Sequence, residues 1–151
     1  MKVTAVVASI LLVGVSARAG ETGPTASRTV KICIESGPAA PFVLLQAQAT
    51  ASRIFAAIGV AIDWRRTVRA CGNRPEDTIL IRLSTGVNPE RHPGALGYAE
   101  LGGAGRVEVF YDRVVGTAVP KRVPVLLGHV LAHEAAHVLE DVNRSDVHRV
   151  R

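Results

Sequence analysis

The segment Val125–Leu139 constrains the fold of this chain more than any other. It is apolar or glycine throughout, apart from three histidines and one glutamate. Its length and composition predict a helix that is buried on nearly all sides. Pro124 precedes the segment and suits the first turn of a helix, where a missing N–H costs little. We therefore predict a buried helix over Lys121–Glu140, in which the polar residues need a specific reason to be present.

Two of these histidines, His133 and His137, enclose Glu134 in the pattern His-Glu-Ala-Ala-His. On a helix they lie about 40° apart around the axis and one turn apart along it, so both imidazoles can reach one metal ion. Zinc suits neutral imidazole and keeps an open position when it has three protein ligands. Glu134 is the predicted catalytic base, which takes a proton from water and passes it to a leaving amine. His129, one turn upstream, fits a structural core position better than the edge of a cleft.

The remaining segments predict a sheet backed by one further helix. Glycine tolerates the dihedral angles of tight turns, so Gly102–Gly105 predicts a hairpin between its flanking strands. The order of elements predicts an α+β fold, a small domain with a mixed sheet, one backing helix and the buried helix of the motif. The elements are strands at Thr29–Ile34, Val60–Arg65 and Thr78–Ser84, a helix at Phe42–Ile58, and a hairpin of Leu96–Leu101 with Arg106–Tyr111.

Met1–Ala19 has the layout of a secretory signal peptide. Lys2 is followed by a short apolar run and by the small-x-small site Ala17-Arg18-Ala19. The apolar run is too short to span a bilayer comfortably, and the alternative is a buried N-terminal helix. Cleavage near Ala19 would leave residues 20–151, which suit a single domain. We therefore predict a secreted or periplasmic protein without stable membrane insertion.

Charge and cysteine content narrow the class of partner and the redox compartment. The formal net charge is +5 and would fall to +3 without Lys2 and Arg18, and no Lys/Arg run is interleaved with aromatic residues. Nucleic acid is therefore not favoured as a partner. In an exported protein the pair Cys33 and Cys71 indicates a disulfide rather than two buried thiols. The bridge would stabilise the protein by roughly 3–4 kcal/mol by restricting the unfolded chain.

Through the three residues of its motif, the sequence resembles the zincin metallopeptidases. The stretches Val109–Val114 and Leu127–Ala132 make it more similar to a group of uncharacterised secreted bacterial zinc peptidases with a metzincin-like layout. Over about Val30–Ser145, the resemblance implies a mixed sheet, an active-site helix beneath it, zinc as the cofactor, and an edge strand that pairs with a peptide or protein substrate. Leu96–Leu101 is the candidate for that strand.

The chain departs from the metzincin pattern after the motif helix. Glu140 and Asn143 occupy the positions at which that pattern has a glycine and a third ligand. The bacterial group has an Arg-His-Ser segment after the helix, whereas Arg144 is followed here directly by Ser145. Met1 is the only methionine, so the methionine turn of metzincins has no counterpart.

A catalytic site still needs a third ligand, because zinc sites normally use three or four. His148 is the preferred candidate by residue type and Asp146 is its competitor, provided that the tail folds back toward the motif. The chain is then expected to be a secreted zinc-dependent metallopeptidase that hydrolyses peptide bonds. The alternative is a catalytically inactive zincin-like binding domain that has lost the third ligand. A third hypothesis is a protein that binds zinc without hydrolysis.

Overall fold

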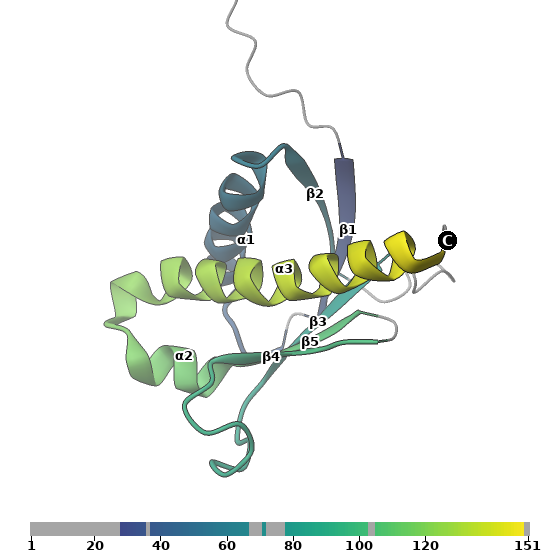
Figure 1. Ribbon diagram of the computed structural model, residues 1–151. Helices are drawn as coiled ribbons and strands as arrows, with labels where there is room; N and C mark the ends of the chain where they lie inside the picture. The colour runs from purple at the N-terminus through teal and green to yellow at the C-terminus, as the bar shows by residue number, and fades with distance from the viewer. Residues whose placement is uncertain (1–27, 36, 67–70, 72–77, 103–104, 150–151) are drawn as a thin grey trace, which may run out of the picture.

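The computed structural model describes residues 28–35, 37–66, 71, 78–102 and 105–149, and of residues 145–149 it describes the backbone alone. The predicted signal peptide and its cleavage site lie outside the described residues. The described part is an α+β structure, in which one mixed sheet is combined with three α-helices (Figure 1). The predicted fold class is confirmed at this level.

The sheet has five strands in the order β2-β1-β3-β5-β4. Neighbouring strands are parallel except for β4, which runs antiparallel to β5 and forms one edge of the sheet. The predicted hairpin and the interior place of the apolar third strand are both confirmed. The strands are β1 (Arg28–Glu35), β2 (Val60–Arg65), β3 (Thr78–Ser84), β4 (Gly97–Glu100) and β5 (Arg106–Phe110).

The helices are α1 (Pro41–Ala56), α2 (Tyr111–Thr117) and α3 (Val123–Arg149), with a short 3-10 turn, η3 (Pro120–Arg122), before α3. The sequence analysis missed α2, which begins directly after β5. It also ended the motif helix too early, at Glu140. No glycine or proline follows before Arg149, so nothing in the sequence stops the helix. No helix among the described residues is both long and apolar enough to cross a membrane.

Helices α1 and α3 pack on the same face of the sheet, and α3 crosses in front of the strands in Figure 1. Alternate residues of each strand point into this layer, as the period of two requires. One row of paired positions runs Ile34, Ile81, Val107 and Ala99 across four strands. Inward-facing residues of both helices close the core, among them Leu44, Ala47, Ala51 and Phe55 of α1 and Leu127, Leu131, Ala135 and Val138 of α3.

A glycine sets how closely α3 approaches α1. A Cβ atom added at Gly128 would lie 2.6 Å from Thr50 Cβ and 2.7 Å from the Ala47 carbonyl oxygen. Both distances are far below van der Waals contact, so any other residue would push the helices apart. Because Gly128 lies shortly before the motif on α3, this contact sets how closely that part of the helix approaches α1.

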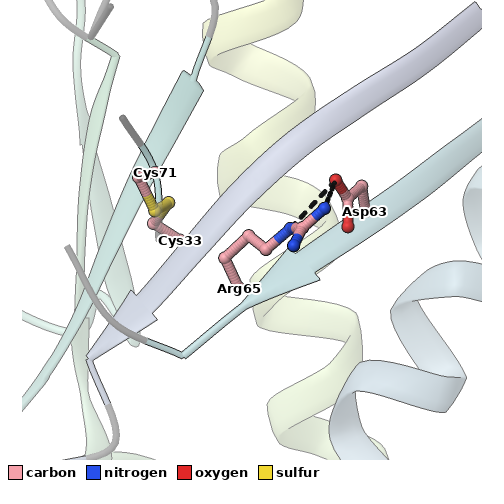
Figure 2. A network of polar contacts seen from close by, with 4 residues as sticks. All are labelled: Cys33, Asp63, Arg65 and Cys71. Carbon is pink, nitrogen blue, oxygen red and sulfur yellow. Dashed lines mark hydrogen bonds and ion pairs between the residues drawn. A yellow bond between two sulfur atoms is a disulfide. The ribbon is translucent and has the colours of Figure 1, made fainter. Parts of the chain in front are cut away.

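The opposite face of the sheet carries the disulfide. Cys33 and Cys71 are bonded, with Cα atoms 6.2 Å apart and both residues buried, which confirms the predicted pairing (Figure 2). Nearby on β2, the Asp63 carboxylate accepts two hydrogen bonds from Arg65, at 2.8 and 3.1 Å, and raises the pKa of that guanidinium (Figure 2). The bridge thus joins the interior strand β1 to the segment that leads from β2 to β3.

Removing the bridge is expected to lower the free energy of unfolding substantially. The double variant Cys33→Ala/Cys71→Ala should lose about 3–4 kcal/mol, because its unfolded chain regains the entropy of an open 38-residue loop. Guanidinium chloride unfolding followed by circular dichroism measures the loss. Wild-type protein in excess reductant should show a similar shift of the midpoint. Equal stability of the variant and the oxidised wild type would contradict a structural bridge.

Candidate metal centre and cleft

Helix α3 brings the two motif histidines together on its exposed side. The Nε2 atoms of His133 and His137 are 3.1 Å apart, and both residues are exposed. Their rings are nearly perpendicular, at 87°, with centroids 4.6 Å apart. The two nitrogens therefore converge on one point in front of the helix, as the spacing of four residues predicts.

This separation suits two ligands of one tetrahedral zinc ion. Zn–N bonds of about 2.0–2.1 Å at a tetrahedral angle place two imidazole nitrogens about 3.3–3.4 Å apart. The observed 3.1 Å differs from that by a few tenths of an ångström, which a small rotation of either ring removes. The donor set is incomplete, however: among side chains that the structure describes, no group of three or more His, Cys, Asp or Glu residues could hold a metal ion.

Glu134 points away from the exposed stripe and toward the sheet. It is only 9% exposed. Where the chain is described, no hydrogen bond or ion pair is found for its carboxylate. The side chain is buried mainly through its carbon atoms, and its carboxylate oxygens are not sealed from solvent. A carboxylate that is held next to two converging imidazoles and is open to water is a candidate for proton transfer.

The space for Glu134 exists because the edge strand has a glycine opposite it. Leu83, Val109 and Gly97 form a row of paired positions that ends at the edge strand. A Cβ atom at Gly97 would lie 2.9 Å from Glu134 Cγ and 3.2 Å from its Oε1. Glu134 thus fills the space that a side chain at position 97 of β4 would otherwise occupy. The sequence analysis missed the role of Gly97, although an isolated glycine in a strand often marks such a close approach.

The prediction that the motif helix is buried on nearly all sides is wrong. His129, His133 and His137 are four residues apart and form one exposed stripe, while the rest of the motif packs inward. The prediction that His129 is a core residue is wrong for the same reason. The apolar composition was a poor guide to burial, because some of the apolar residues are exposed, such as Val125, which is 48% exposed. The alanines of the segment do not indicate which face of the helix is buried.

A cavity of about 800 Å³ opens beside this stripe. His129, His133 and Glu134 of α3 line one side of it, and residues of the β4 entry segment line another. The end of α1 supplies an apolar wall. The base candidate Glu134 and the ligand candidate His133 therefore face the same space, while His137 lies on the helix just outside it.

The tail residues do not join this group. Asp146 and His148 lie in the last turns of α3, so the backbone does not fold back. At about 1.5 Å per residue along a straight helix, the backbone of His148 is roughly 16 Å along the axis from His137, and that of Asp146 roughly 13 Å. The expected return of the tail toward the motif is wrong, because the helix simply continues. The third zinc ligand stays a prediction, and no described side chain lies next to His133 and His137 to serve as one.

Arg113 organises the loop that leads into β4. Its guanidinium stacks on Phe110, 4.4 Å from the ring centroid. Phe110 in turn donates its backbone N–H to the Leu96 carbonyl at 2.9 Å, next to Gly97. The sequence analysis included Arg113 only within the stretch Val109–Val114 and gave it no role, since its contacts exist only in the folded loop. The guanidinium donates hydrogen bonds of 2.8–3.2 Å to the carbonyl oxygens of Asn88, Arg91, His92 and Ala95.

Comparison of the chain with protein-family models, with curated proteins and with solved structures found no match.

Proposed function

We propose that the chain is a secreted zinc-dependent metallopeptidase, with His133 and His137 as two zinc ligands and Glu134 as the general base. The observation that carries the proposal is that the two histidines of the motif are exposed whereas its glutamate packs against the sheet. The two imidazoles converge at 3.1 Å on the exposed side, and Glu134 is buried next to them without a described partner.

The edge strand supports a peptide as the substrate. No described strand pairs with the second edge of β4, so its backbone N–H and C=O groups are open to an added strand. β4 packs against α3, and Gly97 touches Glu134. A peptide that extends the sheet along β4 would therefore pass directly over the motif. This arrangement, with an antiparallel edge strand above a helix that carries His-Glu-x-x-His, also supports the resemblance to zincins.

The residues then have separate tasks in hydrolysis. When bound, zinc would supply Lewis-acid polarisation of the scissile carbonyl and would lower the pKa of a nearby water. Glu134 accepts a proton from the attacking water as the new C–O bond forms, and passes it to the leaving amine as the C–N bond breaks. Its burial against Gly97 holds the carboxylate in place for both transfers. β4 holds the substrate backbone.

One observation favours a second candidate, a zincin-like binding domain without catalysis. No third ligand side chain is in place among the described residues, and two ligands alone hold zinc weakly. Such a domain would keep the open edge of β4 as a peptide-binding element and would not retain zinc.

Zinc content separates the two candidates. The purified protein, dialysed without added metal, is expected to retain about one zinc per chain by elemental analysis. His137→Ala should lose it, and His129→Ala, on the same exposed stripe, should keep it. Zinc retention with hydrolysis of unstructured protein substrates supports the peptidase. Wild-type protein that holds no zinc would overturn the peptidase and favour the binding domain.

A further inference from the structure

Helix α1 has a solvent-facing side that carries almost no charge. Arg53 is the only charged residue among the 16 residues of the helix. Phe42 is 67% exposed and Leu45 is 56% exposed. Charged and polar residues normally occupy the solvent-facing side of a helix. A nearly uncharged side with two large exposed apolar residues is instead typical of a surface that another protein covers.

The exposed residues form one row along α1, which we call the α1 seam. It consists of Phe42, Leu45, Ala49, Ser52 and Ala56, which are spaced alternately by three and four residues. Ser52 is partly buried and the other four are exposed. This is the spacing with which one helix packs along a second helix in a coiled coil. The short alanine and serine side chains allow the axes of two such helices to come close together.

The α1 seam lies next to a free edge of the sheet, the edge formed by β2. The indole N–H of Trp64 on β2 donates a hydrogen bond of 2.8 Å to the Ser52 hydroxyl, so the seam and the strand are in direct contact. β2 is the last strand in the sheet order, and no described strand pairs with its outer side. The N–H and C=O groups of such an edge can pair with another chain. Seam and edge together therefore fit a partner that brings both a helix and a strand.

The charges on β2 indicate that this partner is a second copy of the chain. Asp63 and Arg65 lie on the sheet face opposite the helices, with side chains 34% and 47% exposed (Figure 2). When two copies of β2 pair antiparallel around a two-fold axis at Trp64, each Asp63 lies opposite the Arg65 of the other copy. Opposite charges at directly paired positions stabilise a sheet, whereas an axis at Asp63 would pair two aspartates.

The same axis brings the two seams together. Trp64 would lie opposite its own copy, on the helix side of the sheet, where Ser52 holds the indole. Because Ser52 belongs to the α1 seam, the two α1 helices would meet across the axis and cover Phe42 and Leu45. A two-fold interface needs one patch that is complementary to itself. Both the uncharged seam and the pair of opposite charges on β2 meet this requirement.

We infer that the protein forms a two-fold homodimer, in which β2 pairs antiparallel with β2 of the second copy and the two α1 seams pack against each other. The two five-stranded sheets then form one continuous sheet, with a β4 strand at each outer end. Because β4 and β2 are opposite edges, the dimer leaves the edge strand beside each motif helix open. The inference therefore does not depend on the proposed peptidase function.

Sedimentation velocity tests the dimer. Wild-type protein is expected to sediment at twice the monomer mass. Leu45→Glu should be monomeric, because it places a charge within the α1 seam. Val115→Glu is the matched control and should stay dimeric, since Val115 lies on α2, is 45% exposed and is not part of the seam. Zinc content and hydrolysis should be the same in both variants. Trp64 is the only tryptophan, so its emission should shift to longer wavelength in Leu45→Glu alone.

A pair of charge variants tests the strand register. Asp63→Arg and Arg65→Asp should each be monomeric, because each places like charges opposite one another on both sides of the axis. Their equimolar mixture should form a heterodimer, in which opposite charges face each other again. This recovery is specific to the interface, since neither variant regains an ion pair within its own β2.

Three results would contradict the inference. A monomeric wild type would overturn it and leave the α1 seam to a different partner. Leu45→Glu that remains dimeric would place the interface elsewhere on the molecule. A mixture of the two charge variants that stays monomeric would overturn the pairing of β2 around Trp64.

Discussion

Replacing Glu134 by glutamine is expected to lower kcat/KM for peptide hydrolysis by about 10²–10⁴-fold while the protein keeps its zinc. Glutamine has nearly the same shape, so it fills the space opposite Gly97, but it cannot accept the proton of the attacking water. The substitution removes no described hydrogen bond or ion pair and keeps the contact with Gly97, so the thermal midpoint should stay about the same. Hydrolysis assays, elemental analysis and thermal unfolding of the same preparations give all three quantities.

Glu140→Gln is the matched control for this experiment. Glu140 lies on the same helix and is exposed, so the same chemical change there removes a solvated charge and should alter none of the three quantities. Unchanged hydrolysis in Glu134→Gln would exclude Glu134 as the base. Loss of both zinc and activity would mean that Glu134 acts through the metal site rather than on the substrate.

Gly97→Ala is expected to lower kcat/KM by about 10²-fold without changing zinc content, because displacement of a catalytic group by about 1 Å has effects of that size. The new Cβ would lie 2.9 Å from Glu134 Cγ, so the carboxylate must move. Zinc should be retained, since the atoms nearest to the added methyl group belong to Glu134 and not to His133 or His137. The free energy of unfolding should fall by about 1–3 kcal/mol through overpacking.

Gly116→Ala provides the comparison for the glycine change. Gly116 lies in α2, and an added Cβ there meets nothing within 4 Å. The same methyl group should therefore leave hydrolysis unchanged and, in a helix, should raise stability by about 0.5–1 kcal/mol. Gly97→Ala with wild-type kcat/KM would show that the contact between β4 and Glu134 does not position the base.

The helices, strands and disulfide could be predicted where the residue pattern of a short segment matches the environment of that segment in the folded protein. Thr78–Ser84 is apolar enough to mark an interior strand, and it lies between β1 and β5. The glycines at 102–105 predicted the turn between β4 and β5. Cys33 and Cys71 are the only two cysteines of the sequence, so only one intramolecular bridge was possible. The strand and the turn were predictable from a few neighbouring residues, and the disulfide was predictable because no other cysteine competes for the pairing.

Other features were missed because their cause lies in another part of the chain. Helix α2 was assigned partly to the preceding strand, since Tyr111 continues an alternating pattern. The apolar composition of α3 predicted burial on all sides, whereas the sheet and α1 cover only part of it and leave the three histidines exposed. Glu134 alone of the polar motif residues faces the strands.

The sequence by itself determined the α+β order of elements, the disulfide pair and the spacing that puts His133 and His137 on one face of a helix. These follow from periodicity and covalent chemistry, which act over a few residues. Only the tertiary structure decided that Gly97 lies against Glu134 and that the end of α1 forms the apolar wall of a cavity. Both depend on strand register and on the close crossing of helices at Gly128, which bring together residues that no local pattern connects.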